Sequence, residues 1–249
     1  MRSPRVLYRC DDRVATLTLV RPRLSNRVDA AMVSELQAAC QRAREEDAWV
    51  VVLTGRGAAF ACGGERTPGL EEMERHQAAR VVAALDRPVV AAINGDALDQ
   101  GLELALACDI RIAVRGARLG LTHLASGALP WDGGTQRLAR LVGHARALEL
   151  LLLSRVVAAD EACEMGLVHQ VVPQEELNAT VEELAQRLAS VGPIAARYVK
   201  EAVKLGRDAP LAHGLRLEAD LSFLLQSSAD RSEGIRSLLE KRKPQFVGA

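Results

Sequence analysis

Two unbroken apolar segments, each followed by a glycine-containing loop, constrain the fold of this chain most strongly. They cover residues 49–53 (WVVVL) and 88–93 (PVVAAI), and glycines follow at Gly55 and Gly95. Apolar runs without polar alternation are typical of strands buried on both faces, as in parallel sheets covered by helices. These two segments therefore predict an α/β core.

Strand and helix patterns alternate along the first half of the chain. Residues 14–20 (VATLTLV) alternate apolar side chains with threonine, which is typical of a strand. Residues 29–44 carry apolar side chains at helical spacing, and Asp29 stands where an N-cap is expected. The remaining predicted elements of this half are helices at 71–85 and 101–107 and a strand at 110–114. This alternation fits an open crossover sheet and also a spiral stack of units, and periodicity leaves both open.

After Gly133 the chain is predicted to be mostly helical. The predicted elements are helices at 134–153 and 158–165, a strand at 168–172, and a helical region at 175–241 with breaks at 192–193 and 208–210. A helical region that follows an α/β core indicates a second layer or an oligomerisation element. We divide the chain into a core over residues 1–190 and a C-terminal helical region over residues 191–249.

Composition and charge narrow the class of protein. Of the 249 residues 49% are hydrophobic, and 32 basic side chains balance 32 acidic ones, so the charge favours neither a nucleic-acid nor an acidic-membrane partner. Five cysteines without CxxC spacing argue against a disulfide framework and a cysteine-based metal site, and favour a reducing compartment. The sequence shows no signal-peptide core and no apolar stretch of about 20 residues. We therefore expect a cytoplasmic protein without a metal.

Two loops that follow the apolar strands are candidates for holding a ligand. They cover residues 59–65 (AFACGGE) and 94–103 (NGDALDQGLE). Glycine lets a backbone approach a ligand closely, and the first residues of a helix present N–H groups without intrahelical partners. Two such sites that face each other would stabilise negative charge on a thioester oxygen. Neither loop has the spacing of a phosphate-binding loop.

Two titratable residues near these loops have a functional and a structural interpretation. Glu103 lies among Leu102, Leu104 and Leu106, and an apolar environment raises the pKa of a carboxyl group toward the range that suits proton transfer. An acidic residue is equally expected early in a helix because the helix dipole favours it. His123 is one of five histidines, and a single histidine is more often structural than catalytic. Composition alone leaves both interpretations open.

Over nearly its full length the sequence resembles the crotonase superfamily, which contains enoyl-CoA hydratases and isomerases. The matching segments, in family order, are residues 14–26 (VATLTLVRPRLSN), 51–65 (VVLTGRGAAFACGGE), 91–112 (AAINGDALDQGLELALACDIRI), 129–138 (LPWDGGTQRL), 158–173 and 230–246 (DRSEGIRSLLEKRKPQF). The resemblance implies a spiral of strand–strand–helix repeats, with C-terminal helices that pack the chains into trimers or hexamers.

The resemblance also assigns roles to individual positions. The backbone N–H groups of Gly64 and Gln100 would form an oxyanion hole, and Glu103 falls on the first catalytic glutamate of the family. The residues that would contact coenzyme A are Arg23, Leu24, Ala61, Cys62, Gly63, Lys241 and Phe246.

The sequence departs from the family pattern at two places. His123 stands where true hydratases have their second catalytic glutamate, twenty residues after Glu103. Asp99 and Gln100 replace glycines that family members usually carry. A backbone donor does not depend on its side chain, so Gln100 can still serve. Asp99 can cap the following helix, although its charge would disfavour an oxyanion if it pointed inward.

Several reactions of the superfamily are compatible with the resemblance. We expect hydration of a 2-enoyl-CoA, with Glu103 and His123 sharing the acid–base work and no cofactor besides the coenzyme A of the substrate. Isomerisation of an enoyl-CoA is the next alternative, followed by hydrolysis or carbon–carbon bond cleavage of an acyl-CoA. An alternative of another class is a non-catalytic acyl-CoA-binding or assembly subunit. RNA binding has no support, because the charge is neutral and only 3% of residues are aromatic.

Overall fold

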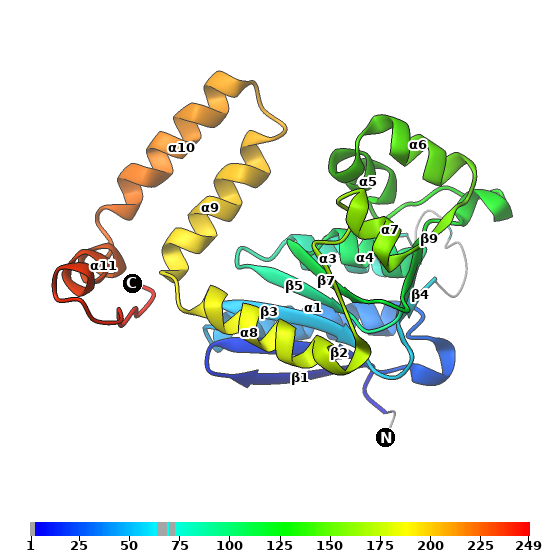
Figure 1. The fold of residues 1–249 in the computed structure, drawn as a ribbon, viewed down its shortest axis with the longest axis horizontal. Coiled ribbons are helices and arrows are strands. Elements are labelled where there is room, and N and C mark those ends of the chain that lie inside the picture. Colours follow the sequence, from blue (N-terminus) through cyan, green and yellow to red (C-terminus); the bar gives the residue numbers. More distant parts are fainter. Residues whose placement is uncertain (1–2, 64–68, 70–72) are drawn as a thin grey trace.

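A computed structural model describes residues 3–63, 69 and 73–249 of the chain. Its larger sheet has the strand order β1-β2-β3-β5-β7-β10 (Figure 1). The strands from β2 to β10 run parallel, and β1 pairs with β2 in the antiparallel sense. These strands are β1 (Val6–Asp11), β2 (Val14–Leu19), β3 (Val50–Gly55), β5 (Val89–Ile93), β7 (Ile110–Val114) and β10 (Gln170–Val172).

A second, smaller sheet has the strand order β4-β6-β8-β9. In each of the consecutive pairs β3–β4, β5–β6 and β7–β8, the first strand belongs to the larger sheet and the second to the smaller sheet. The chain therefore passes from one sheet to the other repeatedly as it advances. This winding decides between the two arrangements that periodicity left open, in favour of the spiral of strand–strand–helix units. The strands of the smaller sheet are β4 (Ala59–Cys62), β6 (Asp96–Leu98), β8 (Arg118–Gly120) and β9 (Val156–Ala158).

Helices cover the sheets and extend beyond them. Figure 1 shows α9, α10 and α11 as an arm that projects from the sheets on the side opposite β4 and α6. The α-helices are α1 (Ala30–Glu45), α3 (Ala78–Ala83), α4 (Gln100–Leu106), α5 (Gly134–Val142), α6 (His144–Leu152), α7 (Ala159–Glu164), α8 (Leu177–Ala189), α9 (Pro193–Gly206), α10 (Leu211–Leu225) and α11 (Ala229–Leu239). Short 3-10 turns are η1 (Pro22–Leu24), η2 (Glu74–His76), η3 (His123–Ser126) and η4 (Gln174–Glu176).

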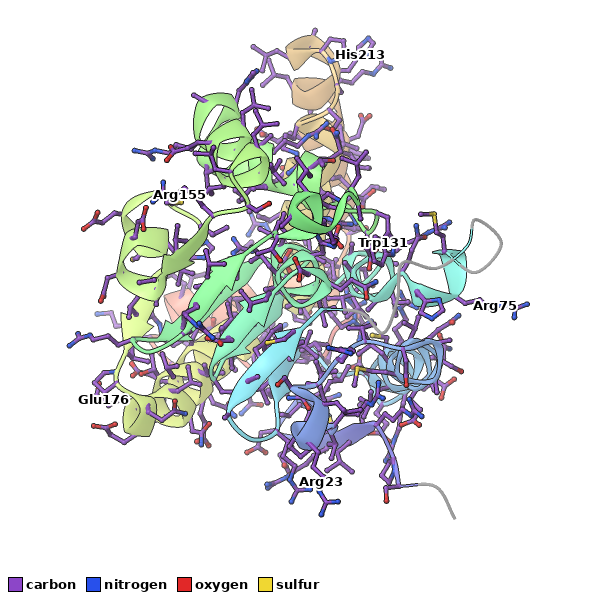
Figure 2. All side chains as sticks on the ribbon, turned by 90° about the vertical axis from the view of Figure 1, so that its right-hand side faces the viewer. Arg23, Arg75, Trp131, Arg155, Glu176 and His213 are labelled. Atoms are coloured by element: carbon purple, nitrogen blue, oxygen red, sulfur yellow. The ribbon has the colours of Figure 1, made fainter. Side chains whose placement is uncertain are left out.

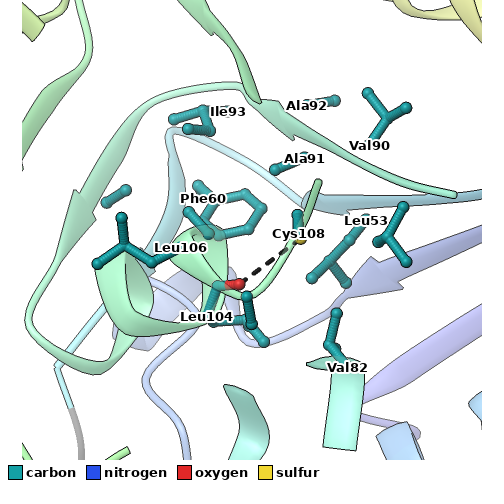
Figure 3. Packing of buried hydrophobic residues seen from close by; sticks show 14 of the residues in the cluster. Leu53, Phe60, Val82, Val90, Ala91, Ala92, Ile93, Leu104, Leu106 and Cys108 are labelled. Carbon is teal, nitrogen blue, oxygen red and sulfur yellow. Dashed lines mark hydrogen bonds between the residues drawn. The ribbon is translucent and has the colours of Figure 1, made fainter. Parts of the chain in front are cut away.

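The core lies between the sheets and the helices that cover them. Phe60 of β4 is fully buried and packs among aliphatic side chains of β5 and α4 (Figure 3). The Cys108 thiol, two residues beyond the end of α4, donates to the Leu104 carbonyl oxygen. Each large apolar side chain buried in this way stabilises the fold by roughly 1.5–3 kcal/mol. The core therefore fixes α4, the helix that carries Glu103, firmly against the strands.

The long apolar patterns predicted their elements well. The predicted strands at 14–20, 49–53 and 110–114 correspond to β2, β3 and β7. Asp29 is confirmed as the N-cap of α1, because its carboxylate accepts the Met32 backbone N–H at 2.8 Å. The single helix predicted at 134–153 is wrong, because Gly143 adopts a φ of 82° and divides it into α5 and α6. A left-handed φ of this kind ends a helix.

The C-terminal arm is joined to the core mainly through α9. The Lys200 ammonium group donates to the Asp109 carboxylate at 2.6 Å and to the Arg87 carbonyl oxygen at 2.8 Å. Beyond α9, α10 packs on α9, with Gly214 against Gly206, and several of its large apolar side chains are exposed. Within the ranges that the structure describes, no helix is long and apolar enough to cross a membrane.

Candidate active site

The two predicted ligand loops meet because a glycine permits close contact between them. A Cβ atom on Gly101 would lie only 1.8 Å from the Ala61 carbonyl oxygen, so any larger residue would push α4 away from β4. The contact is reinforced next to it, where the Gly63 N–H donates to the Leu98 carbonyl oxygen at 2.9 Å. The end of β4 and the start of α4 therefore form one edge of the site.

Gln100 is the first residue of α4, and it is buried. A residue at this position has a backbone N–H that no carbonyl of its own helix accepts, and the helix dipole makes it a good donor to an anion. Gly64, the other predicted oxyanion donor, lies outside the described residues. The pairing of the two N–H groups therefore stays a prediction.

Glu103 is fully buried, and only one of its carboxyl oxygens has partners. Its Oε1 atom accepts the backbone N–H groups of Asp132 at 2.9 Å and of Gly134 at 2.8 Å. Burial raises the pKa of the Glu103 carboxyl group to about 7, and the two backbone hydrogen bonds oppose this rise only in part. Glu103 is therefore able to accept and to release a proton near neutral pH.

Gly134 is the first residue of α5, so the Glu103 carboxyl group lies at the positive end of a second helix. A Cβ atom on Gly134 would come within 2.9 Å of Glu103 Oε1, which explains why a glycine stands there. The Asp132 carboxylate accepts the Ala79 and Arg80 backbone N–H groups at 2.6 and 3.0 Å and so joins this turn to α3. The turn before α5 therefore positions Glu103 and is itself fixed by α3.

His123 begins η3, and only 6% of its surface is exposed. Its Nε2 atom lies 3.9 Å from Glu103 Oε2, which places the two groups side by side. The Trp131 ring packs edge-to-face against the imidazole, with a distance of 5.3 Å between ring centroids. Burial lowers the pKa of His123, and the nearby Asp99 carboxylate opposes this effect. The ring is therefore favoured in its neutral form.

Asp99 stands at the N-cap position of α4, but its side chain makes no capping hydrogen bond, so the predicted side-chain cap is wrong. Its carboxylate turns to the neighbouring segment, where Oδ1 accepts the Thr122 backbone N–H at 2.6 Å and the Thr122 hydroxyl at 2.9 Å. Oδ1 also lies 3.4 Å from His123 Nδ1. Hydrogen bonding to Thr122 competes with capping because one short side chain cannot reach both groups.

Unpartnered polar atoms are concentrated at this site. In the described part of the chain, seven buried side-chain nitrogen and oxygen atoms have no hydrogen-bond partner, and five of them belong to four neighbouring residues. These atoms are Gln100 Oε1, Glu103 Oε2, both ring nitrogens of His123 and Trp131 Nε1. Leaving such groups unpaired is costly, so their clustering indicates a place built to bind a polar ligand or water.

The residues predicted to contact coenzyme A fall into two separate groups. Arg23 and Leu24 are exposed on η1, and Figure 2 shows Arg23 projecting from the surface. The Cys62 N–H donates to the Ser25 carbonyl oxygen at 2.9 Å, so this turn lies beside the end of β4. Lys241 and Phe246 follow α11 instead, in the arm on the opposite side of the molecule (Figure 1).

Several residues of the site were not assigned a role from the sequence. Trp131, Asp132 and Gly134 belong to the segment LPWDGGTQRL, which was singled out only as a family match. Their contacts with Glu103 and His123 join residues about 30 positions apart, and no local pattern reveals such a pairing. The only local hints of a functional role were Trp131 and Asp132, which directly precede the glycine pair.

The spiral of strand–strand–helix units, with a buried carboxyl group and an imidazole beside a helix N-terminus, defines the class of protein as a crotonase-fold enzyme. The family model described as enoyl-CoA hydratase/isomerase matches residues 9–249. The chain belongs to the enoyl-CoA hydratase/isomerase family, which confirms the resemblance found in the sequence.

Individual relatives agree with this assignment. The chain is 40% identical to a probable enoyl-CoA hydratase of Rhodobacter capsulatus over 98% of both chains. It is 34% identical to a crotonyl-CoA hydratase of Syntrophomonas wolfei over 99% of both chains. Its structure matches a crystal structure of enoyl-CoA hydratase from Bacillus anthracis with a TM-score of 0.94 and 38% identity, covering 98% of this chain and 100% of that one.

Proposed function

We propose that this enzyme catalyses the reversible addition of water to the double bond of a 2-enoyl-CoA. The observation that carries the proposal is the pair of buried groups Glu103 and His123, whose Oε2 and Nε2 atoms lie 3.9 Å apart. Hydration needs one group that accepts a proton from water and one that delivers a proton to carbon. The relatives named above as hydratases support the same reaction.

The protonation states of the two groups suggest how they divide the work. Neutral His123 accepts a proton on Nε2 as the water oxygen bonds to C3 of the substrate. The neutral Glu103 carboxyl group, with its pKa of about 7, gives its proton to C2. The negative charge that develops on the thioester oxygen is stabilised by the Gln100 N–H, together with the donor predicted at Gly64. Transfer of the proton from His123 to Glu103 then restores the starting state.

The test incubates the protein with saturated, enoyl, dienoyl and oxo acyl-CoA substrates and analyses the products by mass spectrometry. Gain of one water from a short 2-enoyl-CoA is the expected result. Release of free coenzyme A would identify the reaction as hydrolysis instead of hydration. An unchanged mass with a new retention time would identify it as isomerisation. Binding without turnover of any substrate would favour a non-catalytic subunit.

Two variants connect the reaction to the site. Glu103→Gln and His123→Ala are each expected to lower kcat by about 100-fold or more, which is the usual contribution of a general acid or base. The matched controls are Glu182→Gln on α8 and His144→Ala on α6, which replace exposed residues of the same types. Full hydration activity in both site variants would refute the assignment.

We further propose that the chain assembles with copies of itself, as a trimer or a pair of trimers, through the C-terminal arm. Phe223 and Leu211 on α10 are 74% and 76% exposed, and Leu238 at the end of α11 is 78% exposed. Exposed apolar surface of this extent is typical of a protein interface. A neighbouring copy would also explain how Lys241 and Phe246 could reach coenzyme A. The cytoplasmic location expected from the five unpaired cysteines stays a prediction.

A further inference from the structure

Asp99 occupies a conformation that an aspartate seldom adopts. Its φ is 51° and its ψ is −121°, a backbone region that favours glycine. Strained backbone of this kind persists where the surrounding structure holds it, and it is concentrated at functional sites. Here the Thr122 N–H and hydroxyl both donate to one carboxylate oxygen and hold the side chain in place. The structure therefore fixes a carboxylate at a position where its backbone is unfavourable.

The carboxylate lies between the first ligand loop and the imidazole of His123. Its Oδ1 atom is 3.4 Å from His123 Nδ1, and its Oδ2 atom is 3.9 Å from the place where a Cβ atom on Gly63 would stand. On the other side of the ring, Nε2 faces Glu103 Oε2. The imidazole therefore has one carboxyl group near each of its two nitrogens.

We propose that Asp99 is a positioning residue that binds the Nδ1–H of His123 and so leaves Nε2 as the proton acceptor that faces Glu103. In a neutral imidazole one nitrogen carries the proton, and the hydrogen bond made by that nitrogen decides which one it is. This inference rests on the proposed hydration, in which Nε2 takes the proton of water. The distance of 3.4 Å is longer than a good N–H···O bond, but hydrogen bonds of catalytic groups commonly tighten when substrate binds.

The electrostatic surroundings of the imidazole agree with this role. In the part of the chain that the structure describes, the charged or titratable groups against the ring are Asp99 and Glu103, and Trp131 covers another edge. Burial lowers the pKa of His123, whereas the Asp99 charge raises it. Removing that charge should therefore lower the pKa of His123 further and weaken its Nε2 atom as a base.

The first test examines the imidazole directly and needs no substrate. Nitrogen chemical shifts of His123 in the unmodified protein are expected to show the neutral ring with its proton on Nδ1. In Asp99→Asn the pKa of His123 should fall and the preference for this tautomer should weaken. The control Asp96→Asn removes a carboxylate of β6 that pairs with exposed Arg118, and it should leave both signals unchanged. A neutral ring protonated on Nε2 in the unmodified protein would overturn the proposal.

The second test measures catalysis. Asp99→Asn is expected to lower kcat by about 10- to 100-fold with little change in KM, because the variant weakens a base without removing a substrate contact. The acid limb of the pH profile of kcat should move to lower pH. In a His123→Ala background the same substitution should have no further effect, since Asp99 acts through the ring. Equal losses in both backgrounds would show a merely structural role and refute the inference.

The two proposals fail in different ways. If the unmodified protein hydrates no enoyl-CoA, the proposed function fails, while the nitrogen shifts still decide whether Asp99 sets the tautomer of His123. If hydration is found but the shifts do not respond to Asp99→Asn, only the positioning role is lost.

Discussion

At the scale of single residues, Glu103 combines full burial with a hydrogen-bonding arrangement that involves only one of its oxygens. Two backbone N–H groups hold Oε1 at the start of α5, so the side chain cannot rotate to reach solvent. Oε2 faces His123 and is the only oxygen of the group that is available for chemistry. The burial that raises the pKa of Glu103 also reduces the stability of the fold when this carboxyl group is ionised.

We predict that Glu103→Gln gains stability relative to the unmodified protein as the pH rises. The folded protein binds a proton at Glu103 up to about pH 7, whereas the unfolded chain releases it near pH 4.5. The stabilisation is therefore complete below about pH 4.5 and is lost as the pH rises through about 7. The difference corresponds to about 3 kcal/mol. The glutamine of the variant does not titrate, so the variant keeps its stability as the pH rises. Urea unfolding at several pH values should therefore show the variant becoming more stable than the unmodified protein with increasing pH.

Glu182→Gln on the exposed face of α8 is the control for the exchange of a carboxyl group for an amide. A stability difference between Glu103→Gln and the unmodified protein that stays constant from pH 4.5 to pH 8 would contradict the prediction.

How far the site could be predicted from the sequence depends on how far apart in the sequence the contacting residues lie. Glu103 and His123 were found because the family pattern fixes their positions, and the apolar neighbours of Glu103 already indicated a raised pKa. The partnership between Asp99 and Thr122 was missed, because capping of the adjacent helix was the nearest local use for an aspartate. The contact of Asp132 with α3 spans more than 50 residues, and no spacing rule reaches that far.

At the scale of elements, α4 is held at both ends. Its first turn touches β4 through Gly101, and the buried Arg111 guanidinium binds the Ala105 carbonyl oxygen in its last turn and the Cys108 carbonyl oxygen just after it. The Arg111 Nη1 atom donates to the Cys108 carbonyl oxygen at 2.6 Å and its Nε atom to the Leu167 carbonyl oxygen at 2.8 Å. A cation at a helix C-terminus also interacts favourably with the helix dipole. The helix therefore keeps Gln100 and Glu103 at fixed positions relative to the smaller sheet.

We predict that Gly101→Ala destabilises the protein by about 1–3 kcal/mol, the usual cost of overpacking, and lowers kcat more than tenfold. The added methyl group would collide with the Ala61 carbonyl oxygen and move the start of α4 away from β4. Thermal unfolding and hydration assays provide the measurement. Gly116→Ala is the matched control, because a Cβ atom there meets nothing within 4 Å. Equal stability and activity in the two variants would show that the contact is not needed.

Sequence patterns were most informative for the long elements. Strands β3, β5 and β7 carry five or six residues, enough for a continuous apolar signal. Strands β4, β6, β8 and β9 have only three or four residues, which is too few for a periodic pattern. None of them was therefore predicted as a strand from the sequence. Because the second sheet consists of these short strands, the choice between an open sheet and a spiral required the structure or the family resemblance.

At the scale of the whole molecule, the C-terminal arm has too little contact with its own core to cover its apolar side chains. Salt bridges and backbone acceptors hold α9, whereas α10 and α11 bury few large apolar residues. An arm of this kind is expected to be completed by other copies of the chain.

We predict that Phe223→Glu shifts the protein toward monomers and weakens hydration, because a charge would replace an exposed apolar side chain in the expected interface. Light scattering coupled to gel filtration measures the mass. Arg216→Glu on the same helix changes the charge of an exposed polar position and is the matched control. A monomeric unmodified protein with full activity would contradict both the assembly and its role.

The short distance between His123 Nε2 and Glu103 Oε2 has a stereochemical consequence. A planar enoyl group between two heteroatoms would need about 7 Å, the sum of two van der Waals contacts, and only 3.9 Å is available. In the proposed hydration both groups would therefore act on one face of the double bond, so that hydroxyl and hydrogen would add syn. Hydration of a substituted 2-enoyl-CoA in D2O is expected to give the diastereomer of syn addition, and the anti diastereomer or a mixture would mean that another group protonates C2.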